Sequence, residues 1–370
     1  MKKTVKNTVI FFLCLLISAS VLSCAAESKP AMSLNGTSVS GSIYAYYLAC
    51  YKQYWLTALG QTDTAQFWNT ENEGIKNADR LTQISEEAIK KRIAANYLFD
   101  EYHLKLTDEE YHSIDLMISG IKASVNGEKS IEEDEIFKTL GMNEDDLKSI
   151  LVMDSKVGAL QDHLYGEDGE KKITEKTKEA YYQDNYYRFR LLYLMDGDFV
   201  RDDDGNIVYN DDGNATIKEI SDERYEEKLG LAKDILSKVR DGEDINVYIE
   251  KYSEQLEKDD YKNGHYLCSV NEYGSLISAA VMKLKVGEAG LLDTKFGIYV
   301  IQRTELDPYA WKNEENEAGN DFYNFDTLVM EKEFDDHLKP YVDKVQTDRT
   351  VTDQYKMEEL PYTFSWQYIF

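Results

Sequence analysis

A stretch of the sequence that could hold a metal ion is RDDDGNIVYNDDGN, residues 201–214. Carboxylates and glycines recur in it, as they do in loops that hold calcium through oxygen ligands. An EF-hand loop needs an oxygen ligand at its first position, but with Gly205 or Gly213 as the turn glycine that position falls on Val200 or Val208. The stretch therefore fits a solvated β-hairpin with Asp-Gly turns better than a calcium site.

Outside this stretch, the sequence contains no recognisable pattern of catalytic or metal-binding residues. No Ser-His-Asp arrangement, metal-ligand spacing or phosphate-binding loop is recognisable. We therefore expect neither a metal nor another cofactor. The five histidines are scattered, and we expect them at the surface or in packing roles: His103, His112, His163, His265 and His337.

The charge of the chain excludes one large class of partners. Its 370 residues include 69 acidic and 42 basic ones, a net charge of −27. Nucleic-acid binding needs a basic surface, so no nucleic-acid partner is expected. An anionic membrane surface would also repel the chain, so any membrane attachment should be covalent. The apolar content of 42% is enough to bury a core, and the length suffices for two or three domains.

The N-terminus has the pattern of a bacterial secretory signal. Three lysines among the first six residues precede the apolar run Val9–Leu22. The run closes with VLSC, residues 21–24, which resembles a lipobox, the motif whose cysteine becomes the lipidated first residue of a mature lipoprotein. An ordinary cleaved signal or an N-terminal anchor helix is the alternative interpretation.

The lipobox predicts how the chain is processed and where it is located. We expect a signal peptide at 1–23, a lipid anchor on Cys24, and a tether at 24–34. The protein would then sit at the extracytoplasmic face of the bacterial cell membrane. Beyond the signal and Cys24, only Cys50 and Cys268 remain, and two cysteines so far apart form no disulfide framework.

Residues 35–183 carry mostly helical patterns. Apolar residues recur at helical spacing, and Thr107 with Glu110 forms a capping box. Asn143 can cap a further helix, and Gly141 and Gly166 mark helix ends. The expected helices are 43–59, 85–102, 107–126, 131–140, 143–164 and 174–186.

The pattern changes at Tyr187, where strands begin to alternate with helices. This mixture predicts an α+β domain. Residues 319–342 are again expected to be helical. The elements expected between these regions are a strand at 188–195, helices at 221–239 and 245–252, a strand within 263–270, a helix at 276–284 and a strand at 295–303.

Three segments in this region resemble a parvulin domain: DINVYIEKYSE (244–254), NGHY (263–266) and AAVMKLKVGEAGLLDTKFGIYVIQRTE (279–305). The lipobox, the helical start containing Asn-Gly, the EAYYQDNYY segment before the domain and the closing helix resemble PrsA-type foldase lipoproteins, which share the plan of SurA-like chaperones. The resemblance implies a mostly helical chaperone module, formed by residues 35–183 and 309–370, with a parvulin-like domain inserted at 184–308. That domain would be a small antiparallel sheet flanked by helices.

The resemblance also implies which residues form the site. Tyr193 and Tyr299 align with two histidines that face each other in the family, on its first and last strands. The resemblance therefore implies that the two residues lie side by side on adjacent antiparallel strands, and we expect their phenols within hydrogen-bonding reach because facing phenols can hydrogen-bond each other.

The remaining site positions also follow from the alignment with the family. Gln255 takes a position often held by Cys or Asp, and Thr294 keeps a hydroxyl beside the site. Leu276 replaces the aromatic residue of the proline pocket, to which Tyr266 is also assigned, and His265 replaces an aspartate.

The implied activity is that of a parvulin-type peptidyl-prolyl cis-trans isomerase within a foldase for unfolded or nascent secreted polypeptides. Prolyl isomerisation needs no nucleophile or cofactor, only a site that lowers a barrier of about 18–20 kcal/mol for imide rotation. The loss of both histidines and of the pocket's aromatic residue predicts weak or absent isomerase activity. A non-catalytic surface lipoprotein with a ligand-binding or structural role is the alternative.

The helix at 43–59 is rich in aromatic residues. These side chains either line a cradle for client chains or belong to the hydrophobic core, and both interpretations are compatible with the sequence. They are Tyr44, Tyr47, Tyr51, Tyr54 and Trp55.

Lipidation at Cys24 is directly testable. Metabolic labelling with a radioactive fatty acid should tag the wild-type protein and should not tag Cys24→Ala, because only the cysteine can form the thioether. Cys50→Ala, which removes a cysteine outside the motif, should remain labelled. Label retained on Cys24→Ala would refute the prediction.

Overall fold

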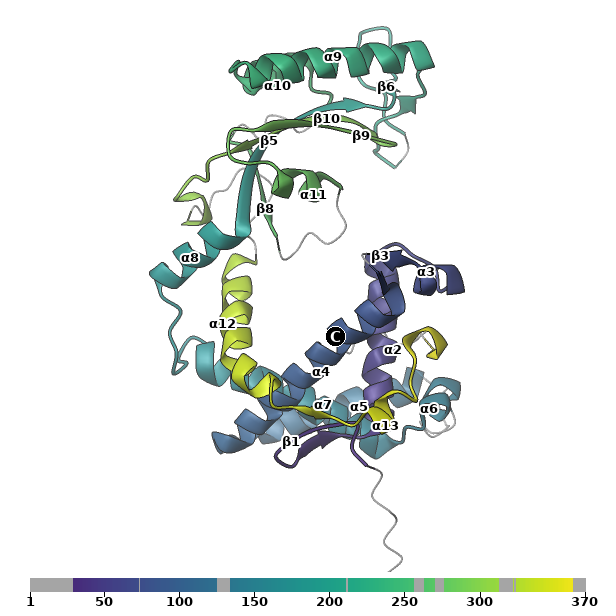
Figure 1. The fold of residues 1–370 in the computed structure, drawn as a ribbon, viewed down its shortest axis with the longest axis vertical. Coiled ribbons are helices and arrows are strands. Elements are labelled where there is room, and N and C mark those ends of the chain that lie inside the picture. Colours follow the sequence, from purple (N-terminus) through teal and green to yellow (C-terminus); the bar gives the residue numbers. More distant parts are fainter. Residues whose placement is uncertain are drawn as a thin grey trace, which may run out of the picture. The chain divides into compact units, whose positions relative to one another are not determined.

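A computed structural model describes residues 29–361, apart from 73, 125–133, 211, 256–262, 270–275, 313–321 and 323. Within these residues the chain forms two compact units (Figure 1). Unit 1 comprises residues up to Lys171 together with those from Phe334 onward, and unit 2 comprises Lys172–Glu333. The expected signal peptide and Cys24 lie outside the described residues. None of the helices formed by the described residues is both long and apolar enough to cross a membrane.

A three-stranded sheet joins the two chain segments of unit 1. The strands β1 (Met32–Leu34), β2 (Thr37–Val39) and β11 (Gln346–Thr347) are antiparallel in the order β11-β1-β2. The expected tether at 24–34 is therefore wrong for its last three residues. Met32 and Leu34 are buried, and this burial holds the segment as a strand.

Most of unit 1 is helical, as the sequence predicts. The capping box of Thr107 and Glu110 is present, and Asn143 caps the N-terminus of α7 together with Asp146. Gly141 adopts the left-handed conformation that ends α6. The helices are α2 (Gly41–Ala58), α3 (Ala65–Asn69), α4 (Asn77–Glu101), α5 (Asp108–Ser124), α6 (Glu135–Leu140), α7 (Glu144–Tyr165), α13 (Arg349–Thr352) and the C-terminal part of α12 (Phe325–Val342).

The aromatic residues of α2 belong mostly to the core. Tyr44, Tyr46 and Tyr47 are at most 1% exposed and pack with side chains of α4, α7 and α12. Tyr54 is the exception, with 56% of its surface exposed. The cradle interpretation is therefore wrong for most of this helix, because the residues at its centre are enclosed on all sides.

Two charged groups inside unit 1 are matched by partners from distant parts of the sequence. Glu86 is buried, accepts a hydrogen bond from the Tyr44 hydroxyl at 2.9 Å, and is held by both terminal nitrogens of Arg349 at 2.6 and 2.9 Å. Asp154 accepts from Arg92 at 3.0 Å. A buried carboxylate without such partners would be strongly destabilising, so these contacts fix how the helices pack.

Unit 2 contains a four-stranded antiparallel sheet in the order β8-β5-β10-β9, which confirms the α+β fold class (Figure 1). One face is covered by α9 (Asp222–Arg240) and the other by α11 (Leu276–Lys283). The short helix α10 (Ile245–Tyr252) packs beside α9. The strands are β5 (Tyr186–Met195), β8 (His265–Cys268), β9 (Ala289–Thr294) and β10 (Gly297–Thr304).

Unit 2 begins earlier and ends later in the sequence than the inserted segment expected at 184–308. Helix α8 (Glu175–Asn185) places Tyr181 and Tyr182 in a buried cluster with Tyr186 of β5 and Phe325 of α12. Because of these aromatic contacts, α8 and the first part of α12 belong to unit 2, which is therefore longer at both ends than expected. Cys268 in the same cluster and Cys50 in unit 1 are free thiols.

The acidic stretch forms two successive tight turns between β6 (Asp198–Phe199) and β7 (Ile217–Lys218). The side-chain Oδ1 of Asp202 accepts from the backbone N–H groups of Asp204 and Asn206 at 3.0 and 2.8 Å, and Asn210 makes the corresponding bonds in the second turn. The N–H donors lower the pKa of Asp202. The side-chain oxygens of Asp202 and Asn210 thus accept hydrogen bonds within the turns. No group of three or more possible ligands among the described residues is arranged to hold a metal ion.

The contact of Glu86 with Arg349 should be required for the stability of unit 1. Arg349→Ala should lower the free energy of unfolding by about 2 kcal/mol, because a buried carboxylate loses its charged partner while Arg349 itself is partly solvated. Urea unfolding monitored by circular dichroism measures this change. Adding Glu86→Gln to Arg349→Ala should restore part of the loss, and an Arg349→Ala variant as stable as the wild type would contradict the assignment.

Candidate functional site

The centre of the unit 2 sheet holds a pair of stacked tyrosines. Tyr193 on β5 and Tyr299 on β10 lie directly opposite each other in the antiparallel register, as the sequence predicts. Their ring centroids are 4.9 Å apart and their planes differ by 22°. The pair lies on the sheet face that α11 covers, and both side chains are half-buried.

The hydroxyl of Tyr193 has a backbone acceptor in addition to the neighbouring phenol of Tyr299. It donates to the carbonyl oxygen of Phe296 at 2.8 Å. Burial, followed by the nearby Tyr299, raises the pKa of Tyr193 to about 12, and burial also raises the pKa of Tyr299. Both phenols are therefore protonated at neutral pH. They can donate hydrogen bonds and offer ring surface, but they cannot act as general bases.

The turn between β9 and β10 is built against the Tyr193 ring. Gly297 has a φ of +134°, and a Cβ added there would lie 2.5 Å from the carbonyl oxygen of Leu194 and 2.6 Å from the ring of Tyr193. The Thr294 hydroxyl closes the same turn, since it donates to the Gly297 carbonyl at 3.0 Å and accepts from the Phe296 N–H at 3.1 Å. The predicted site hydroxyl of Thr294 thus has a structural role in this turn.

A buried lysine, Lys228, connects β5, the strand that carries Tyr193, to α9 and to Glu254. Lys228 of α9 is 3% exposed, and its ammonium donates to the carbonyls of Met195 and Gly197 at 3.0 and 2.6 Å and to Glu254 at 2.9 Å. The Glu254 N–H in turn donates to the Tyr193 carbonyl at 2.8 Å. Gln255 follows directly and is half-buried. The burial of Lys228 has one signal in the sequence: it lies four residues before Ala232, and this helical spacing places it on the apolar face of α9.

The two predicted pocket residues are not gathered around the tyrosine pair. Tyr266 pairs with Arg188 on β5, so it lies on the opposite face of the sheet from Tyr193, where it is buried against the ring of Phe322. Leu276 begins α11 on the correct face, with 58% of its surface exposed. Tyr266 is thus corrected to a core residue, because its strand register turns it away from the pair. The sequence pattern gave no sign of Phe296, which is 63% exposed beside the pair.

His265 is an interior residue at the edge of this sheet. Its ring stacks on Phe189 of β5, with centroids 5.1 Å apart and planes 19° apart. Burial, with the positive charge of Arg190 as the second cause, lowers the pKa of His265 to about 4. The imidazole is therefore neutral at physiological pH.

Comparisons with known proteins gave structural likenesses only. No family model and no curated protein matches the chain. Similar solved structures include PrsA from Bacillus subtilis, at 16% identity over 76% of this chain and 92% of that one with a TM-score of 0.23. The foldase protein PrsA from Streptococcus pneumoniae is similar at 13% identity over 77% and 98% of the two chains, with a TM-score of 0.23.

A further similar structure is the peptidylprolyl isomerase PrsA from Bacillus anthracis, at 15% identity over 69% of this chain and 94% of that one, with a TM-score of 0.27. The structural similarity to PrsA foldases is thus distant.

The lowered pKa of His265 makes unit 2 acid-sensitive. Because the pKa in the folded state, about 4, lies below the ordinary value of 6.5, the contribution of a neutral His265 is complete above pH 6.5 and is lost as the pH falls toward 4. Chemical unfolding at pH 7.5 and at pH 4.5 should show a stability loss that is larger in the wild type than in His265→Gln. A difference on the order of 1–3 kcal/mol is expected. Parallel losses in the two proteins would contradict the assignment.

Proposed function

We propose that the protein is an extracytoplasmic, lipid-anchored chaperone of secreted polypeptides whose inserted α+β unit has weak or no prolyl isomerase activity. The single observation that carries the second half is the stacked pair of Tyr193 and Tyr299, at the two positions where the parvulin resemblance expects histidines. The sequence resemblance to foldase lipoproteins supports the first half.

The chemistry of the pair supports the loss of catalysis. An isomerase must hold a proline in a desolvated pocket and favour the twisted imide over the planar one. Here the Tyr193 hydroxyl is engaged by the Phe296 carbonyl, and the Thr294 hydroxyl is engaged within the turn. Tyr266 lies on the other face of the sheet and Leu276 is exposed. Of the predicted site residues named here, Tyr193 and Thr294 thus have their hydroxyls engaged by other partners, and Tyr266 does not lie on the face of the pair.

Exposed apolar side chains support the chaperone role of unit 1. Tyr54 of α2, Leu59 directly after α2 and Ile84 of α4 are 56%, 36% and 45% exposed, and Ile75 on β4 (Ile75–Lys76) is 40% exposed. Helices α2 and α4 contact each other, so these side chains belong to neighbouring elements. Apolar surface left exposed on a stable scaffold is a suitable contact for unfolded chains.

Chaperone activity can be assigned to a unit because the two cut ends of unit 1 lie close together. The ammonium of Lys171 is 2.7 Å from Nδ1 of His337, so a short glycine-serine linker can replace residues 172–333. Light scattering of a chemically denatured client should show that both the full chain and this shortened chain suppress aggregation. A shortened chain that folds by circular dichroism but leaves client aggregation unchanged would refute the assignment to unit 1.

The same preparation tests the isomerase half of the proposal. The full chain should give little or no acceleration of proline isomerisation in a protease-free assay on a proline tetrapeptide, while a histidine-bearing parvulin serves as the positive control. Isomerase turnover equal to that of the control would refute the proposal, and the aggregation result would be unaffected.

A further inference from the structure

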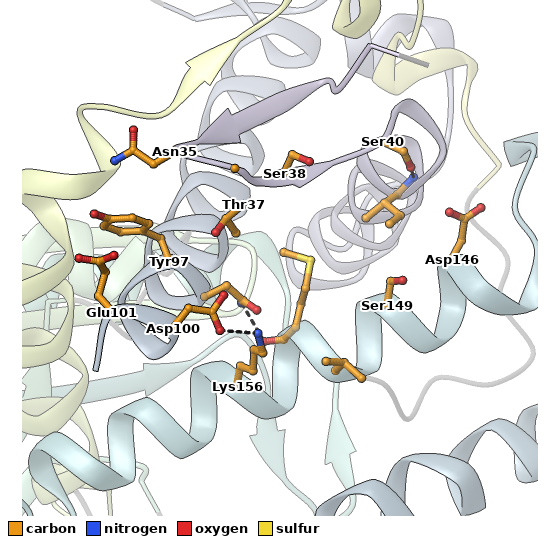
Figure 2. A pocket seen from close by; sticks show the side chains of 15 residues that line it. Asn35, Thr37, Ser38, Ser40, Tyr97, Asp100, Glu101, Asp146, Ser149 and Lys156 are labelled. Atoms are coloured by element: carbon orange, nitrogen blue, oxygen red, sulfur yellow. Dashed lines mark hydrogen bonds and ion pairs between the residues drawn. The ribbon is translucent and has the colours of Figure 1, made fainter. Parts of the chain in front are cut away.

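Unit 1 contains a groove of about 610 Å³ that has no part in the tyrosine site (Figure 2). Its walls are the β1–β2 hairpin, the last turns of α4 and the first half of α7. Figure 2 shows the hairpin along one side, with Tyr97 and Glu101 of α4 and Ser149 and Lys156 of α7 facing it. The volume lies within the range of about 300–1,000 Å³ that is usual for ligand sites.

The groove runs along a free strand edge. Strand β2 ends the β11-β1-β2 sheet, and no strand among the described residues pairs with its outer side. The groove is lined by successive residues, including Thr37 and Ser38. Because side chains of successive strand residues point to opposite faces, contact with both indicates that the strand borders the groove with its edge. Such an edge offers backbone N–H and C=O groups to an added strand.

The charges around the groove favour a cationic ligand. Its lining includes Asp100, Glu101 and Asp146, against the single cation Lys156, which pairs with Asp100 at 2.8 Å. Asp146 is engaged as the capping residue of α7, whereas Glu101 is exposed and has no ion-pair partner among the described residues. Helix α4 ends at Glu101 without a basic residue in its last turn, so the negative end of the helix dipole adds to this charge.

Apolar groups line the remaining part of the groove. Ile43, Val152 and Met153 contribute to the lining, and Met153 is buried. An extended peptide that pairs with β2 would present alternate side chains to different surroundings, one set to the carboxylates and the other to this apolar part. A compact metal ion or a small anion would leave the apolar part and the strand edge unused.

We propose that this groove binds an extended polypeptide segment with alternating basic and small apolar side chains, as an added strand on β2. The inference rests on the proposed chaperone function and names a class of client segment for it. The carboxylate of Glu101 selects the basic side chains, the edge of β2 orders the backbone, and Ile43 and Val152 contact the apolar side chains.

The proposal can be tested with the full chain and a labelled peptide. The probe is a fluorescent ten-residue peptide in which lysine alternates with valine and threonine, and fluorescence anisotropy measures its affinity. A glutamate version of the probe should bind at least about tenfold more weakly, because the charge is reversed. A version methylated at alternate backbone nitrogens should lose a similar factor, because it cannot donate to the β2 edge.

Three variants locate the binding. Glu101→Lys reverses the groove charge and Ser149→Phe fills the groove, and each should weaken binding of the lysine probe by about tenfold or more. Glu167→Lys makes the same charge change at an exposed position outside the groove and should bind like the wild type. Circular dichroism verifies that each variant is folded.

The proposal would be overturned if the lysine probe did not bind to the wild type, or if it bound with an affinity that Glu101→Lys and Ser149→Phe leave unchanged. Equal affinity for the methylated probe would refute strand addition. The aggregation assay on the wild type separates these outcomes from a failure of the proposed function, since apolar clients can be suppressed through the exposed side chains of α2 and α4 even if this groove is empty.

Discussion

The burial of Glu86 is the constraint on which the organisation of the chain depends. A carboxylate that is 3% exposed requires a positive partner, and that partner is Arg349, 263 positions later in the sequence. The β1–β11 pairing of Met32 with Thr347 joins the same two parts of the chain. Unit 1 therefore cannot be completed until the C-terminal segment has been made, and everything between Lys171 and Phe334 must leave unit 1 and return to it.

Unit 2 does not depend on this constraint for its own packing. Its sheet is completed by its own strands, and its hydrophobic clusters are formed within residues 172–333. Lys228 and Glu254 fasten the Tyr193 strand to α9 and to the loop after α10 without any group from unit 1. In the middle of the sheet, the rings of Tyr193 and Tyr299 stack on each other, and the Tyr193 hydroxyl donates to a backbone carbonyl. Such packing and hydrogen bonding meet the requirements of a structural core. A stable scaffold of this kind persists whether or not it catalyses a reaction.

Electrostatics connect the proposed client segment to the chain as a whole. With a net charge of −27, the protein repels acidic polypeptides and attracts basic ones over distances of about a Debye length, roughly 8 Å at physiological salt. The groove of unit 1 has an excess of carboxylates next to an open strand edge. Long-range attraction and local strand pairing would therefore act in the same direction on a basic extended segment.

The sequence by itself determined the elements with strong local signals. The capping residues Thr107 and Asn143 and the left-handed Gly141 marked helix ends correctly, and the residue patterns at 188–195 and 295–303 correctly predicted two strands. These signals are local because a cap or an apolar period acts within a few residues. The lipobox is also a local signal, and the lipidation of Cys24 that it implies remains a prediction.

Only the tertiary structure decided which side chains are enclosed and which strands find partners. Strands β1 and β2 have three residues each, too short for an alternation to stand out, and they form because Met32 and Leu34 are buried and β11 returns from the far end of the chain. Tyr44 and Tyr47 are core residues rather than a cradle, and Tyr266 turned away from the site because of its register with Arg188. Burial and register depend on contacts between residues distant in sequence, and no local pattern contains them.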